Sequence, residues 1–237
     1  TWTAAAANDA GSIPLTEFGD RPRILLLLGD DRCVVYGRNS AHVMTFVGGA
    51  AVFAIRTISN VLGAAGPFAA AEIRGQRHLV VSRHNISLFD GIDFRRIDQR
   101  IHDDFYNDEA NLNFLDRVRV GYDRGNELVF VFYVSKAATQ AQGFYPDRMY
   151  IYDDKNEEWY GPSNLSHYVT AVGSLTGEFV VVIDSVTDVI DTVSLTIDDL
   201  HAWTKVGSIL IFGTDVGKLF GFDNTVVTNG GSNITRR

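Results

Sequence analysis

Cysteine, proline and methionine are scarce in this chain of 237 residues, which holds one Cys, five Pro and two Met. The single cysteine, Cys33, excludes an intrachain disulfide framework. Few prolines beside 22 glycines indicate many tight turns and exclude a proline-rich linker or a collagen-like repeat. The longest apolar run, Leu128–Val134, has the length of one strand, well short of the roughly 18–20 residues that a membrane-spanning helix needs.

Positive charge is also in short supply. Lysine and arginine number 21 against 29 acids, which gives a net charge of -8 and argues against a protein that wraps nucleic acid. Basic residues gather locally at Arg74–Arg83, from Arg95 to Arg100 and at Arg236–Arg237, with acids close by. We interpret these groups as solvated strand faces or subunit contacts.

Short apolar runs separated by Gly, Asp, Asn and Ser predict an all-β fold. Helical signals are few, and one short helix is expected at 107–118, which opens on Asn and has acids in its first turn. Residues 68–73 are expected to form a hairpin with the apolar run that follows. The strand-like runs are Ile24–Leu28, Cys33–Tyr36, His78–Val81, Leu128–Val134, Met149–Tyr152, Phe179–Ile183 and Ile209–Phe212.

Internal repetition narrows the fold class. The segment VVYGRNSAHVMTF from Val34 and the segment VVSRHNISLFDG from Val80 align at an offset of 46 residues, which superposes Asn39 on Asn85. Segments from Met149 and Ile211 have a similar layout, and each is typical of an antiparallel hairpin. A period of 40–50 residues in hairpins favours a β-propeller-like array of about five blades, with a β-sandwich as the alternative.

Two segments resemble ligand-binding loops. GTDVGKL at Gly213–Leu219 is similar to a phosphate-binding loop but has three residues between its glycines and Leu219 where Ser or Thr is required, so we interpret it as a hairpin turn. DDKNEE at 153–158 invites a calcium interpretation, yet it lacks the central Gly and the spaced acids of a calcium loop. A solvated turn is the favoured interpretation, and calcium is the alternative.

No catalytic pattern emerges from the remaining chemistry-bearing residues. The histidines show no metal-ligand spacing and have no partner cysteines. Cys33 lies in an apolar strand, which predicts a buried and inert thiol. We therefore expect a non-enzymatic protein with no catalytic, cofactor-binding or metal site residues and no cofactor. The six histidines are His42, His78, His84, His102, His167 and His201.

One stretch, residues 58–97, carries a more specific pattern. A "G-x-x-G-P" loop is followed by a strand, a Gly turn, a strand that ends in Ser, and a "hydrophobic-x-hydrophobic-aromatic-Asp-Gly" segment. The sequence Leu27–Asn39 is similar to a preceding blade, and Tyr150–Trp159 to a "Y-x-Y" strand, polar turn and Trp. The chain thereby resembles the blades of bacteriophage tail proteins over about 24–162, and more loosely over 207–224. The residues of the central match are Gly63, Gly66, Pro67, Gly75, Ser82, Ile86, Leu88, Phe89, Asp90 and Gly91.

This resemblance implies a structural component of a phage tail hub, nozzle or adaptor ring, located in the virion. It implies other tail and connector proteins as partners, a homo-oligomeric ring, and DNA that passes through without sequence-specific binding. An acidic lumen would let DNA slide without the counterion release that drives binding. The alternatives are a propeller-fold glycan-binding or glycan-cleaving protein at a host surface, and a cellular propeller scaffold.

The repeat predicts a single propeller-like domain over residues 1–237. The chain begins at Thr1, in the middle of the pattern and without an initiator Met. We expect either that strands from both ends close one ring, or that these residues belong to a longer tail protein.

Overall fold

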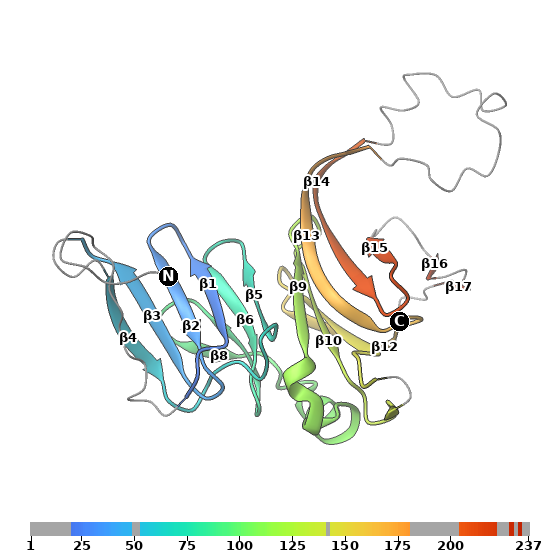
Figure 1. Ribbon diagram of the computed structural model, residues 1–237, viewed down its shortest axis with the longest axis horizontal. Helices are drawn as coiled ribbons and strands as arrows, with labels where there is room; N and C mark the ends of the chain where they lie inside the picture. The colour runs from blue at the N-terminus through green and yellow to red at the C-terminus, as the bar shows by residue number, and fades with distance from the viewer. Residues whose placement is uncertain are drawn as a thin grey trace, which may run out of the picture.

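The computed structural model describes residues 20–48, 53–140, 143–180, 204–221, 228–229 and 232–233. The prediction of an all-β fold is confirmed, because antiparallel strands form almost all of the regular structure (Figure 1). The first two sheets each have four strands in chain order. Sheet 1 comprises β1 (Ile24–Leu28), β2 (Arg32–Tyr36), β3 (Ala41–Phe46) and β4 (Phe53–Ser59), and sheet 2 comprises β5 (Ala70–Ile73), β6 (Arg77–Val81), β7 (Ile86–Phe89) and β8 (Phe94–Arg96).

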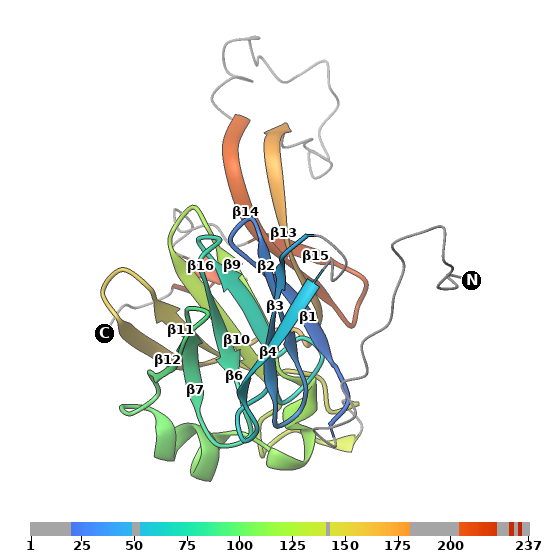
Figure 2. The ribbon, with the colours of Figure 1, turned by 90° about the vertical axis from the view of Figure 1, so that its left-hand side faces the viewer.

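The second half of the chain continues the same pattern. Sheet 3 again has four strands in chain order, whereas sheet 4 has three, two of which form a long hairpin that extends beyond the other sheets (Figure 2). A separate two-stranded pair joins β16 (Thr228–Asn229) to β17 (Ser232–Asn233). Sheet 3 comprises β9 (Arg119–Asp123), β10 (Leu128–Tyr133), β11 (Arg148–Asp153) and β12 (Glu158–Asn164), and sheet 4 comprises β13 (Val169–Val180), β14 (Thr204–Thr214) and β15 (Leu219–Gly221).

The 46-residue repeat corresponds to equivalent hairpins. The segments from Val34 and Val80 form β2–β3 and β6–β7, the second and third strands of two consecutive sheets. The segment from Ile211 forms the second and third strands of sheet 4, and that from Met149 the third and fourth of sheet 3. The hairpin expected after residue 68 is β5–β6. Where the period predicts about five units, the described residues form four sheets of three or more strands.

The first strands of consecutive sheets lie side by side. β1 contacts β5, β5 contacts β9, and β9 contacts β13. A parallel bridge between Phe68 and Arg119, with the Val120 amide donating to the Phe68 carbonyl at 2.9 Å, joins the start of sheet 2 to the start of sheet 3. Each sheet thus grows outward, in chain order, from a strand that borders its neighbours (Figure 1).

The G-x-x-G-P loop connects sheet 1 to sheet 2 and lies against backbone on both sides. A Cβ at Gly63 would overlap the carbonyl oxygen of Gly37, and one at Gly66 would overlap the carbonyl oxygen of Asp116. Between the two glycines, the Ala65 amide donates to the Val81 carbonyl at 2.9 Å. The motif therefore needs glycine for close backbone contact, which is a structural role.

A continuous apolar core joins the first three sheets, and a smaller one lies between sheets 3 and 4. Aromatic residues fill much of the large core, because alternate positions of each strand face a neighbouring sheet. The smaller core packs Phe130 and Phe132 of β10 against Val169 and Leu210 of sheet 4. The fully buried aromatic residues are Tyr36, Phe89, Phe105, Phe130, Phe132, Tyr133, Tyr150 and Tyr152.

Two short helical segments replace the single helix expected at 107–118. A π-helical segment, η2 (Asp104–Glu109), ends at Ala110, which pairs as an isolated bridge with Ser135. The side chain of Asn111 then accepts a hydrogen bond from the Asn113 amide and begins the 3₁₀ segment η3 (Leu112–Arg117). The expectation was wrong about continuity, because backbone pairing with the residues after β10 interrupts the helix.

Candidate functional site: the hollow between the first strands

A hollow of about 530 Å³ lies where the four sheets meet. Residues from or just before the first strand of every sheet line it, which places it at the common border of all four. Most of its lining is apolar, and two arginines, Arg23 and Arg119, are the charged members. The other lining residues are Ile24, Leu25, Leu26, Pro67, Phe68, Ala70, Val120, Thr170, Ala171 and Val172.

Arg119 is held by an aromatic ring. Its guanidinium carbon lies 4.7 Å from the centre of the Phe68 ring, and its Nε is buried without a hydrogen-bond partner. Burial lowers the pKa of the Arg119 guanidinium from its ordinary value.

The second arginine of the lining, Arg23, donates from Nη1 to the Ala65 carbonyl at 2.9 Å. Because this lining has two cations and no carboxylate, the acidic lumen expected from the net charge does not correspond to this hollow.

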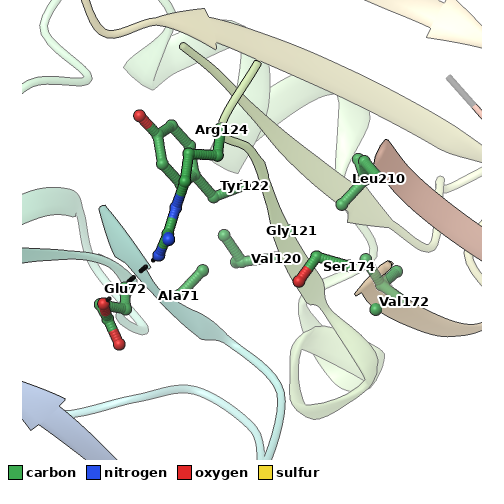
Figure 3. A pocket seen from close by; sticks show the side chains of 10 residues that line it. Ala71, Glu72, Val120, Gly121, Tyr122, Arg124, Val172, Ser174 and Leu210 are labelled. Carbon is green, nitrogen blue, oxygen red and sulfur yellow. Dashed lines mark ion pairs between the residues drawn. The ribbon is translucent and has the colours of Figure 1, made fainter. Parts of the chain in front are cut away.

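A second pocket, of about 260 Å³, lies further along β9 than the hollow (Figure 3). Its one carboxylate, Glu72, and Arg124 point toward each other from opposite walls, with Arg124 Nη2 3.9 Å from Glu72 Oε1. Gly121 lies opposite sheet 4, and a Cβ there would overlap the Val172 side chain and lie 2.7 Å from Leu210 Cδ1. The missing side chain lets sheet 4 approach β9 closely.

The size of the hollow decides what can pass through it. B-DNA is at least roughly 16 Å wide, from the depths of its two grooves, so a 10 Å length fills about 2,000 Å³. The hollow of about 530 Å³ cannot admit a duplex. This hollow is therefore not itself a channel for duplex DNA.

Sheets 1 and 2 are joined by a buried histidine. His78 Nε2 lies 2.6 Å from the Leu27 carbonyl oxygen, which can only accept, so Nε2 carries the proton. Nδ1 then accepts from the Tyr36 hydroxyl at 2.8 Å. Burial lowers the pKa of His78 to about 4, so the imidazole is neutral near pH 7.

Sheets 2 and 3 are joined by an ion cluster around one buried carboxylate. The Asp154 side chain is fully buried and accepts from Arg77 Nη2 at 2.6 Å, while Arg74 Nε lies 3.1 Å from Asp154 Oδ2. Arg74 also pairs with Glu127 at 2.8 Å. These arginines precede or begin β6, whereas Asp154 and Glu127 lie in turns of sheet 3.

Further contacts extend this joint outward. Arg95 forms a two-pronged pair with Glu157, and Trp159 Nε1 donates to the Ile97 carbonyl at 2.8 Å. The buried Asp98 accepts from Arg96 Nε at 2.6 Å and lies 2.8 Å from His102 Nδ1. We interpret the local basic groups as solvated strand faces or subunit contacts. Arg74, Arg95 and Arg96 are exposed, as that interpretation expects, and Arg74, Arg77 and Arg95 also pair with acids of sheet 3. Arg236 and Arg237 lie outside the described residues.

The loops singled out in the sequence have structural roles. The segment at 213–219 forms the β14–β15 turn, in which the Thr214 amide donates to the Lys218 carbonyl at 2.9 Å, so the hairpin interpretation is confirmed. DDKNEE is the β11–β12 turn, where Asp153 accepts from the amides of Lys155 and Asn156. A solvated turn describes Asp153 but was wrong for Asp154, whose buried side chain pairs with Arg74 and Arg77.

The candidate reactive residues are dispersed. His42 and His78 are buried in different strands, His84 is exposed, His102 and His167 are half-buried, and His201 lies outside the described residues. Cys33 is half-buried on the outer face of β2, and burial raises the pKa of its thiol, so the prediction of a buried cysteine was wrong. Among the described residues, no three His, Cys, Asp or Glu side chains gather in a group able to hold a metal ion.

Comparison with known proteins adds no family assignment, since neither the protein-family models nor the curated proteins searched gave a match. In the described part of the chain, no helix has the length and apolar character needed to cross a membrane.

Proposed function

We propose that this chain is a non-enzymatic structural component of a bacteriophage tail, built as a β-propeller-like array that assembles in several copies around the DNA channel. The arrangement of the first strands carries the proposal. Four consecutive sheets begin with β1, β5, β9 and β13, which contact one another in order and border one hollow. Propeller blades are small antiparallel sheets arranged radially around a centre, and this arrangement fits that description.

The connectivity supports blades over a sandwich. In a β-sandwich with Greek-key connections, strands distant in the sequence become neighbours within a sheet. Here each of the four sheets is a continuous meander of consecutive strands. The chain thus completes one sheet before it begins the next, as expected of blades that pack face to face.

The joints between sheets support a scaffold function. The buried carboxylate of Asp154, in sheet 3, pairs with Arg74 and Arg77 of sheet 2, and His78 of sheet 2 bonds to Tyr36 and Leu27 of sheet 1. Such contacts hold sheets in fixed positions relative to one another. The motif that carries the resemblance to phage tail blades has the same role, because its glycines bring the connecting loop against the backbone.

The residues that line the two pockets can be compared with those that a glycan-binding or glycan-cleaving protein would need. That hypothesis predicts several carboxylates together with Tyr or Trp at one mouth of the ring. Among the described residues, the two pockets around the first strands contain one carboxylate, Glu72, which faces Arg124, and one tyrosine, Tyr122. No observation therefore favours the glycan function over the structural one.

Composition analysis of purified phage particles tests the proposal. Peptides of this chain should be present in virions from the source of the sequence, in a fixed ratio to the other tail proteins and in more than one copy per particle. Antibodies against the chain should label the tail. A chain found only in infected-cell lysate, and removed with the soluble proteins during particle purification, would contradict the proposal.

A further inference from the structure

The hollow between the first strands has the composition of a ligand pocket. Its volume of about 530 Å³ lies within the range of roughly 300–1,000 Å³ that small-molecule pockets span. Such pockets are mostly apolar and contain a few polar groups that fix the orientation of the ligand. Here the apolar wall includes Leu25, which is 61% exposed, and Phe68, which is 56% exposed, and the charged groups are Arg23 and Arg119.

Arg119 is a partly buried cation without an acidic neighbour in the hollow. No carboxylate belongs to the described lining, and Nε of Arg119 is buried without a hydrogen-bond partner. Burial lowers the pKa of the guanidinium, and the electrostatic neighbour that opposes this effect is Tyr145 rather than an acid. A desolvated cation costs free energy when no anion accompanies it, so an anion beside Arg119 would be stabilising.

The guanidinium of Arg119 has one edge left to receive that anion. The Phe68 ring occupies one side, with its centre 4.7 Å from the guanidinium carbon. Nε is the Arg119 nitrogen that is sealed from solvent without a partner, so the two Nη nitrogens remain accessible. A carboxylate can accept from both nitrogens of such an edge through two parallel hydrogen bonds.

Both arginines are held in place by the backbone around them. A parallel bridge pairs Arg119 with Phe68, the residue whose ring contacts the guanidinium. The amide of Arg23 donates to the Tyr36 carbonyl at 2.7 Å, and its side chain donates to the Ala65 carbonyl. The cations are therefore positioned before a ligand arrives, which lowers the entropic cost of binding.

We propose that the hollow binds a small molecule with one carboxylate at the end of an apolar chain, with the carboxylate on Arg119 and the chain against the apolar wall. Arg23 adds a second positive charge to the same lining. One carboxylate suits these two cations better than a doubly charged phosphate, which loses more hydration and needs more donors, because Arg23 already bonds to the Ala65 carbonyl. This binding activity goes beyond the proposed function and does not depend on it.

Probes of equal chain length test the need for a negative charge. Isothermal titration calorimetry of the whole chain at pH 7 compares octanoate with octan-1-ol and octylammonium. Octanoate should bind at least about 10-fold more tightly than octan-1-ol, because hydrogen bonds to charged groups are the stronger ones, and octylammonium should bind more weakly than either. Acetate, which has the carboxylate without the chain, should bind at least about 10-fold more weakly than octanoate.

Arg119→Met tests which residue holds the carboxylate. Methionine keeps an unbranched apolar side chain beside Phe68 and removes the charge, and the backbone bridge does not depend on the side chain. Octanoate affinity should fall at least about 10-fold, to that of octan-1-ol, while octan-1-ol affinity stays the same. Arg83→Met is the matched control, since Arg83 is exposed in the β6–β7 turn and lies outside the lining, and it should leave both affinities unchanged.

A second variant keeps the proposal testable if the first one does not fold, and circular dichroism checks the folding of both. Arg23→Met removes the other positive charge of the lining and should weaken octanoate binding at least about 3-fold, again without an effect on octan-1-ol.

The remaining outcomes would each contradict the proposal. Equal affinities for octanoate and octan-1-ol, or no binding of octanoate, would show that the hollow does not recognise a carboxylate. Octanoate binding that withstands Arg119→Met in a folded protein would place the carboxylate elsewhere, and a parallel loss of octan-1-ol binding would point to general damage of the hollow. A chain that is present in purified virions and has no affinity for octanoate would overturn this inference and leave the proposed function intact.

Discussion

His78 makes the stability of the fold depend on pH in a defined window. The imidazole is buried between sheets 1 and 2 with a folded-state pKa of about 4, whereas an unfolded chain restores the ordinary value of 6.5. The unfolded state therefore binds the proton more readily, and the folded state is favoured fully only above pH 6.5. As the pH falls from 6.5 toward 4, this contribution to stability is lost.

The magnitude follows from the two pKa values. The full difference corresponds to about 3 kcal/mol, and between pH 7 and pH 5 the loss is about 2 kcal/mol. Asp and Glu side chains titrate mostly below this range, so the histidine contribution can be separated from theirs. The contribution arises because protonated His78 would lose the Tyr36 hydrogen bond to Nδ1 and would place a charge in the core.

Urea unfolding at pH 7 and pH 5 measures this loss as a shift of the midpoint. His78→Gln removes the titrating group and should lower stability at pH 7, yet it should show a pH dependence smaller by about 2 kcal/mol than that of the natural chain. His84→Gln, at an exposed position, is the control and should keep the natural pH dependence. Equal pH dependence in the natural chain and in His78→Gln would refute the reasoning.

Three further substitutions test the joints and the connecting loop by urea unfolding. Asp154→Asn should cost about 2 kcal/mol because the buried side chain loses its charge-assisted bonds, while both arginines keep access to water; Glu157→Gln, in an exposed pair, should cost less than about 1 kcal/mol, and equal losses would contradict the special role of the buried carboxylate. Gly66→Ala should cost about 3 kcal/mol or more through overlap with backbone, and Gly173→Ala, which meets nothing, about 0.5 kcal/mol or less; a neutral Gly66→Ala would disprove the close contact. Trp159→Phe removes the hydrogen bond from Nε1 and should cost about 1 kcal/mol, and no loss would show that this bond adds nothing to the joint.

The strands were predictable because their signals are local. Alternation and turn residues around Val34 and Val80 predict hairpins from a few residues each, and the structure has β2–β3 and β6–β7 there. The β14–β15 turn at Gly213–Leu219 was predictable for the same reason, since its spacing excludes a phosphate loop and its residues favour a turn.

The joints were not predictable because their partners are distant in the sequence. Asp154 and its partner Arg77 are separated by 77 positions, so a local interpretation of DDKNEE as a solvated turn had no means of finding the pair. The prediction that Cys33 is buried was wrong for a related reason. Its apolar neighbours predict burial, but among the described sheets sheet 1 packs against a neighbour on one face only, which no local pattern shows.

The hollow depends on the assembly of all four sheets. Its lining comes from segments at 23–26, 67–70, 119–120 and 170–172, which no local pattern brings together. The repeat did carry a signal for this hollow, because equivalent positions in successive repeat units are expected to take equivalent places in the fold. The net charge of -8 gave no guide to its lining, which is apolar with two arginines.

The native mass of the particle formed by the chain tests the central claim most directly. A subunit that encloses a channel must associate, so light scattering coupled to size exclusion, at micromolar concentration and physiological salt, should give a mass that is an integral multiple of 26.2 kDa. Electron-microscope images of that particle should show a ring with an opening wide enough for duplex DNA. A homogeneous species of 26.2 kDa at every concentration would contradict the account.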